Sequence, residues 1–99
     1  KQMKAIFIAF DQAYYDTITE ALLRNGCRGF TAWEQVQGRG SKTGTPHYGS
    51  HAWPSMASSI ITIVDDEKVD VVLNVLHKMD VATPKLGLRA FVWAVERTI

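Results

Sequence analysis

The 99-residue sequence has little cysteine and no excess of charge of either sign. Its one cysteine, Cys27, cannot form a disulfide within the chain, which excludes a small domain held together by disulfides. Eleven basic residues stand against ten acidic ones, so the net charge of +1 gives no electrostatic basis for nucleic acid as the main partner. No apolar run is long enough for a membrane span or a signal peptide, and we therefore expect a cytoplasmic protein without direct membrane insertion.

The residue patterns of an enzyme are also missing from the sequence. Cys27 has no histidine near it in the sequence, so it fits a small packed side chain better than a nucleophile. The acidic cluster at residues 65–70 is typical of a helix start, where carboxylates interact well with the helix dipole. His77 falls on a predicted helix and is expected to be solvated. We therefore expect a protein that is not an enzyme.

The chain is predicted to be a single domain, 1–99, with one hydrophobic core. Apolar, β-forming residues predict strands at 4–10, 29–36, 59–64 and 87–97. Helices are predicted at 12–25, between Asp11 as the cap and Gly26 as the stop, and from 65 or 66 to about 79. The order βαββαβ predicts an α+β, ferredoxin-like sandwich, in which four antiparallel strands carry both helices on one face. The first and third strands should be central.

The first and last predicted strands are apolar on both sides. In the last strand, Phe91 and Trp93 alternate with Ala90 and Val92, so both faces carry apolar side chains. Two helices cover one face of such a sheet, and the other face of a monomer would be a large apolar patch. We therefore expect a symmetric homo-oligomer whose open sheet faces meet. The alternative is that these aromatic residues pack around the edges of a monomer.

A long loop, residues 38–58, separates the second and third predicted strands, and loops of this length are usually functional or disordered. His47 and His51 lie four residues apart and could share a divalent metal if other ligands are supplied; otherwise both are unliganded surface residues. Tyr48 and Trp53 are large side chains in a polar segment, as is typical of anchors at protein interfaces. The loop is therefore predicted to contact a protein partner.

Two stretches place cations beside glycines. "GRGSKTG", residues 38–44, has a composition that lets backbone N–H groups face an anion, although a flexible hinge explains it equally well. Lys85 and Arg89 lie beside a second glycine turn and either bind the same anion or are solvated. The residues predicted to bind a small anionic effector are Gly38, Gly40, Lys42, Lys85 and Arg89.

The βαββαβ order with this loop resembles the nitrogen regulatory PII and PII-like signalling proteins over essentially the whole chain. The second strand of that family ends in V-x-G-x-G, matched by Val36, Gly38 and Gly40, and opens a loop called the T-loop. "IITIVDDEKVDVVLNVL" looks like the family's third strand and acidic helix start. "TPKLGLRAFV", residues 83–92, stands where the family has T-x-x-x-G-D-G-K-I-F-V, with Arg89 at the position of a phosphate-contacting lysine.

The resemblance implies a homotrimer that binds a nucleotide or another small anion in clefts between subunits. It also implies a T-loop that engages a protein target, such as an enzyme or a membrane transporter. Leu86, Gly87 and Leu88 replace the family's G-D-G, and Ser58 stands near a lysine used around 2-oxoglutarate. These departures favour a PII-like protein with another small effector, or with none, over a sensor of ATP and 2-oxoglutarate.

Two other classes share this order of elements. A trimeric, CutA-like divalent-cation tolerance protein would use His47 and His51 as metal ligands. An amino-acid-binding ACT-type module expects a short connection between the second and third strands, which the loop 38–58 contradicts.

Overall fold

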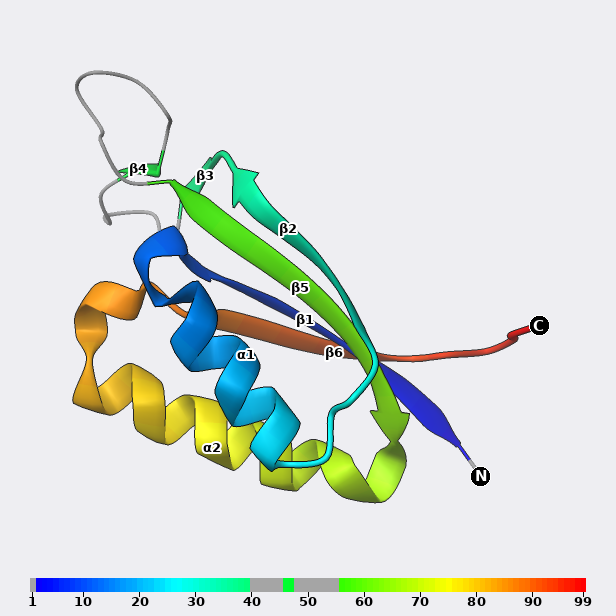
Figure 1. Ribbon diagram of the computed structural model, residues 1–99. Coiled ribbons are helices and arrows are strands. Elements are labelled where there is room, and N and C mark those ends of the chain that lie inside the picture. The colour runs from blue at the N-terminus through cyan, green and yellow to red at the C-terminus, as the bar shows by residue number, and fades with distance from the viewer. Residues whose placement is uncertain (1, 40–45, 48–55) are drawn as a thin grey trace.

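The computed structural model describes residues 2–39, 46–47 and 56–99 (Figure 1). Three short 3-10 helices, η1 to η3, accompany two α-helices and six strands in this part of the chain. In chain order the elements are β1 (Met3–Asp11), η1 (Gln12–Tyr14), α1 (Tyr15–Arg24), β2 (Phe30–Val36), β3 (Gly38–Arg39), β4 (Pro46–His47), β5 (Ala57–Asp65), η2 (Asp66–Lys68), α2 (Val69–Ala82), η3 (Pro84–Leu86) and β6 (Arg89–Ala94).

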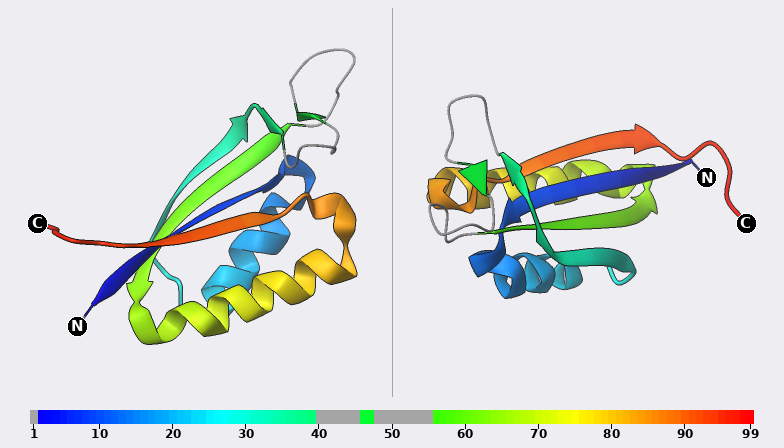
Figure 2. Two further views of the ribbon diagram at one scale, coloured as in Figure 1. Left: turned by 180° about the vertical axis from the view of Figure 1, so that it is seen from behind. Right: turned by 90° about the horizontal axis from the view of Figure 1, so that it is seen from above.

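Four of the strands form one antiparallel sheet in the order β2-β5-β1-β6. Both α-helices lie on one face of this sheet and the other face carries no helix (Figures 1 and 2). β3 and β4 form a separate two-stranded ladder beyond the end of β2. This arrangement confirms the predicted α+β, ferredoxin-like fold. β1 and β5 are central, as predicted, and β2 and β6 are the two edges.

The last strand is shorter than predicted, because β6 runs from Arg89 to Ala94 rather than over 87–97. Gly87 has a φ of 59° and closes η3, with its N–H donating to the Pro84 carbonyl oxygen at 3.2 Å. A strand cannot begin in that left-handed conformation. At the other end the last strand pair is Ala94 with Lys4; one further hydrogen bond joins the Val95 N–H to the Met3 carbonyl oxygen at the start of β1, and residues 96–97 extend beyond this pairing.

Both predicted boundary signals of the first helix are present. The Asp11 carboxylate accepts a hydrogen bond from the Ala13 N–H at 2.9 Å and starts η1, which leads into α1. At the C-terminus Gly26 has a φ of 85° and its N–H donates to the Leu23 carbonyl oxygen, while the Cys27 N–H donates to that of Leu22. This pair of bonds is a Schellman motif, which satisfies the last carbonyl groups of the helix.

The core lies between the helices and the covered face of the sheet. Ile6, Ile8 and Phe10 alternate along β1 toward the helices, and each is at most 2% exposed. The residues that form this buried cluster are Ile6, Ile8, Phe10, Ile18, Leu22, Cys27, Ile60, Val64, Val72, Leu76, Leu86 and Leu88. Cys27 is thus a packed core side chain, as expected from the sequence.

Candidate functional site

The face of the sheet without helices, called here the open face, is apolar. Phe91 of β6 pairs with Phe7 of β1, which pairs with Ile61 of β5, so these three side chains form one row across the sheet. The next row contains Trp93 and Ile63 on either side of Ala5. Four large members of the open face remain about half exposed in the single chain: Trp33 (46%), Ile63 (46%), Phe91 (56%) and Trp93 (49%).

The exposure of these residues bears on the two alternatives left by the sequence. If the aromatic residues packed around the edges of a monomer, Phe91 and Trp93 would be covered by the same chain. They are not covered, and the residues that pair with them on β1, Phe7 and Ala5, are also apolar, whereas Arg89 lies at the end of the same face. A continuous exposed apolar surface of this kind is typical of an interface with another protein chain.

The turn before β6 holds two of the predicted effector residues outward. Leu86 and Leu88 are buried, at 2% and 6% exposure, and fix the turn to the core from both sides of Gly87. Lys85 and Arg89 are exposed. One Arg89 guanidinium nitrogen, Nη1, donates to the carbonyl oxygen of Leu88 at 2.8 Å, so the cation folds back against its own turn.

Gly38, a third predicted effector residue, lies at the far end of β2. It pairs with His47 in the β3–β4 ladder, beyond the last pair of the main sheet, Val36 with Ala57. Gly40, Lys42, Tyr48, His51 and Trp53 lie outside the described residues.

The predicted effector residues that the structure describes lie at opposite edges of the sheet, with Lys85 and Arg89 at one edge and Gly38 beyond the other. Arg89 pairs with Ala9 of β1, Ala9 with Ser59 of β5, and Ser59 with Trp33 of β2. Three strand spacings therefore separate β6 from β2, which is roughly 14 Å. Gly38 lies farther along, beyond β2. A small anion cannot contact both Arg89 and the Gly38 backbone within one chain, so a single chain does not bring these predicted effector residues together, and their role stays a prediction.

The structure gives no support to a metal centre in the part of the chain it describes. No group of three or more His, Cys, Asp or Glu side chains is positioned to hold a metal among residues 2–39, 46–47 and 56–99. His47 belongs to β4, and His51 lies outside these residues. Metal binding by these two histidines stays a prediction. His77 is exposed on α2, as expected.

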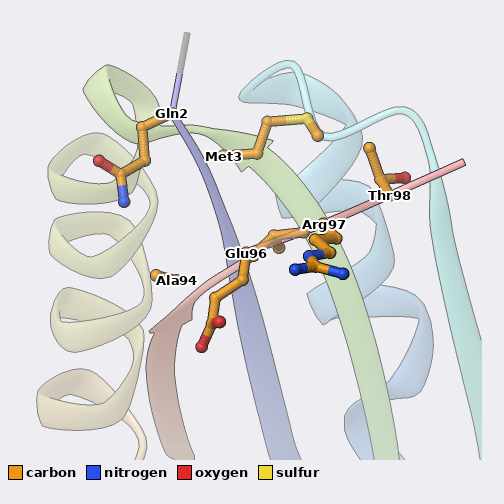
Figure 3. Close-up of a pocket in the computed structure, with 7 residues that line it drawn as sticks. Gln2, Met3, Ala94, Glu96, Arg97 and Thr98 are labelled. Atoms are coloured by element: carbon orange, nitrogen blue, oxygen red, sulfur yellow. The ribbon is translucent and has the colours of Figure 1, made fainter.

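Two hollows open at the end of the sheet away from β3 and β4. The larger, about 550 Å³, lies between the start of β1 and the segment after β6 (Figure 3), where Val95 N–H donates to the Met3 carbonyl oxygen at 3.0 Å. The smaller, about 330 Å³, lies beside the end of α1 and includes Cys27 and Lys68. Neither is lined by a predicted effector residue.

The thiol of Cys27 is expected to be unreactive in this position. Burial raises the pKa of its thiol, and the nearby Lys68 amino group and a hydrogen bond with Thr62 oppose this only in part. Since the thiolate is the reactive form, the folded environment protects this side chain from electrophiles.

Sequence reasoning missed the irregularity at the end of β2. Trp33 pairs with Ser59 and Val36 pairs with Ala57, so two residues of β2 face one residue of β5, which is a β-bulge. The residue opposite the bulge is Ser58, whose side chain is buried. The available signal was a polar serine pair, "SS", directly before the apolar run of β5.

Among the described residues, no helix is both long and apolar enough to cross a membrane. The family model for nitrogen regulatory protein P-II matches residues 3–99. No curated protein matches the chain in sequence.

Solved structures show the same fold. CPII of Thiomonas intermedia K12, a nitrogen regulatory PII-like protein bound to ADP, AMP and bicarbonate, superposes with a TM-score of 0.75 and 22% identity, over 96% of this chain and 93% of that one. A putative PII-like signalling protein from Thermus thermophilus superposes with a TM-score of 0.69 and 22% sequence identity, over 95% of this chain and 87% of that one. A DUF3240 family protein from Shewanella baltica superposes with a TM-score of 0.71 and 12% sequence identity, over 99% of this chain and 94% of that one.

Proposed function

Because this chain belongs to the nitrogen regulatory protein P-II family, we propose that it is a PII-like regulatory protein. It binds a small anionic effector in clefts between the subunits of a homotrimer, and it engages a protein target through the loop 38–58. Its role is regulatory rather than enzymatic, and we expect it to act in the cytoplasm. The target is an enzyme or a transporter.

The placement of the effector residues carries this proposal. Lys85 and Arg89 belong to the β6 edge and Gly38 to the β2 edge, on opposite sides of the sheet. One anion can contact both groups only if the β6 edge of one subunit lies beside the β2 edge of a neighbour. The open face supports the assembly that this requires, because its half-exposed aromatic residues would be covered by other subunits.

The chemistry of the two edges favours an adenine nucleotide or a smaller anion. CPII binds ADP, AMP and bicarbonate, which all carry negative charge. Arg89 offers a charged planar donor and Lys85 a second cation, and both are exposed for such a ligand. The Leu88 carbonyl that now accepts from Arg89 would be exchanged for a charged acceptor, which makes a stronger hydrogen bond.

Calorimetric titration of the protein with ADP, AMP and bicarbonate tests effector binding. We expect Arg89→Ala to weaken binding by a few kcal/mol at most, on the scale of one charge-assisted hydrogen bond. Arg97→Ala is the matched control, because Arg97 is also exposed but lines the hollow at the opposite end of the sheet. Equal affinity for all three proteins would show that the β6 edge does not bind the effector.

Mixing two variants with weakened binding tests whether the cleft lies between subunits. Arg89→Ala removes the cation at one edge, and Gly38→Val adds a side chain where we expect backbone to approach the anion. After the two variants are refolded together in equal amounts, each cleft of a head-to-tail ring takes Arg89 from one chain and Gly38 from its neighbour. Each of these residues is intact in half of the chains, so both should be intact in about a quarter of the clefts. Recovery of binding in the mixture, but in neither variant alone, is the expected result. No recovery would argue for a site within one chain.

A further inference from the structure

Two buried hydroxyl groups of β5 hold the edge strand β2. The Ser58 hydroxyl, Oγ, donates to the Glu34 carbonyl oxygen at 2.6 Å, and the Thr62 hydroxyl, Oγ1, donates to the Gly29 carbonyl oxygen at 2.9 Å. Ser58 is 0% exposed and Thr62 is 1% exposed. The two bonds are alike in chemistry and burial, but they secure opposite ends of β2.

The Ser58 bond occurs at the bulge. Glu34 and Gln35 face Ser58 alone, so part of their backbone is left out of the regular ladder between the strands. The Ser58 hydroxyl donates to the Glu34 carbonyl oxygen at the point where the bulge disrupts the ladder, and loss of this hydrogen bond would cost free energy. The Ser58 side chain thus fixes the shape of the bulge, which bends the strand and increases its twist.

The bulge controls the direction in which the chain leaves the sheet. Val36 is the last residue of β2, and Gly38 begins the β3–β4 ladder two residues later. On the other side of Ser58, the Met56 carbonyl oxygen accepts from the Gln12 N–H at 2.7 Å, which ties the start of β5 to the start of η1. Ser58 therefore links the end of β2, which leads to Gly38, to the central strand β5.

We propose that Ser58 is a positioning residue for the effector site: by holding the bulge in β2, it places the backbone of Gly38 for an anion it never touches. This rests on the proposed function in one respect, that Gly38 belongs to the effector cleft. The Ser58 side chain itself cannot contact an effector, because it is fully buried on the helix side of the sheet, opposite Phe10.

The experiment compares removal of each hydroxyl. Ser58→Ala deletes the bond from Ser58 to the Glu34 carbonyl oxygen, and Thr62→Val deletes the bond to the Gly29 carbonyl oxygen together with the hydrogen bond between Thr62 and Cys27. Thr62→Val should therefore lower the melting temperature at least as much as Ser58→Ala. We expect Ser58→Ala to weaken ADP binding about tenfold, which corresponds to the free energy of one hydrogen bond. Thr62→Val should change ADP affinity by less than about twofold. Ser58→Thr restores the hydroxyl in a crowded site, so it should recover ADP affinity even where its added methyl group lowers the melting temperature.

Hydrogen exchange provides a readout that needs no ligand. Amides of residues 36–39 and 47 should exchange faster in Ser58→Ala than in the wild type, and Thr62→Val should leave them unchanged. Unchanged exchange there in Ser58→Ala, or equal losses of ADP affinity in Ser58→Ala and Thr62→Val, would overturn the positioning role. A different outcome is faster exchange in Ser58→Ala combined with a wild type that binds none of ADP, AMP and bicarbonate. This result would overturn the proposed function, and with it the proposal that Gly38 is positioned for an anion.

Discussion

Trp93 on the open face provides the sharpest test of the proposed assembly. It is 49% exposed in the single chain. An aromatic side chain has on the order of 200 Å² of surface, so roughly 100 Å² of Trp93 would leave water on association. At about 25 cal/mol per Å² this contributes about 2.5 kcal/mol per chain. Trp93→Glu forfeits that contribution and adds an unpaired carboxylate at an apolar contact, which costs several kcal/mol more.

We therefore expect Trp93→Glu to dissociate the protein while leaving the fold of each chain intact. The fold should survive because Trp93 is already half exposed to water before any association and lies outside the buried core cluster. Light scattering at micromolar concentration measures the assembly, and far-UV circular dichroism measures the fold. The wild type should have the mass of three chains and the variant that of one.

Val71→Glu is the matched control. Val71 is also 49% exposed and apolar, but it lies in the first turn of α2, on the other side of the molecule. A carboxylate near a helix N-terminus is favourable, so this variant should keep both the wild-type mass and the wild-type fold. A monomer mass for the wild type, or a trimer mass for Trp93→Glu, would refute the assignment of the open face to the subunit contact.

Three further outcomes follow from the structure. Deletion of residues 45–55 should change the melting temperature by only a few degrees, because it removes no member of the buried core cluster, while capture of the protein target should be lost; collapse of the fold would show that the loop is structural. Leu86→Ala should lower the free energy of unfolding in urea by about 2 to 5 kcal/mol, because it leaves a cavity beneath the turn that carries Lys85; a loss below about 1 kcal/mol would show that the turn is not fixed to the core. Burial raises the pKa of Cys27, so the folded protein keeps the thiol proton to higher pH than the unfolded chain. The stability that this contributes is complete below the ordinary pKa of 9.0 and is lost as the pH rises beyond it. In urea unfolding, the free energy of unfolding of Cys27→Ala should therefore fall less at alkaline pH than that of the wild type.

The fold was predictable because its main signals are local and strong. β1 is a nearly unbroken apolar run, and Gly26 marks the end of α1 by a conformation that few other residues adopt. The two-sided apolar pattern of the last strand predicted the open face correctly. The end of β6 was misplaced because the sequence of residues 95–97 gives no sign of a strand end, whereas the ladder with β1 stops where β1 itself begins, at Met3.

The candidate site was less predictable, because it depends on relations between distant residues. The cationic turn at Lys85 and Arg89 was found from its glycine, but its distance from Gly38 depends on the order of the strands. The bulge opposite Ser58 has no periodic signal, since it is one extra residue in an otherwise regular strand. A serine before an apolar run is also common at a strand start, so its role as a hydrogen-bond donor emerges only from the register.

If the proposed effector contacts Arg89 of one chain and Gly38 of its neighbour, the occupancy of the site must depend on protein concentration. A ligand shared between two chains binds the assembly and not the free chain, so by mass action it must also hold the chains together. Dilution of the protein should therefore lower the apparent affinity for the effector, and saturating effector should lower the concentration at which the assembly dissociates. The abundance of the protein in the cell would then set the sensitivity of the signal, with no change to any residue that contacts the effector.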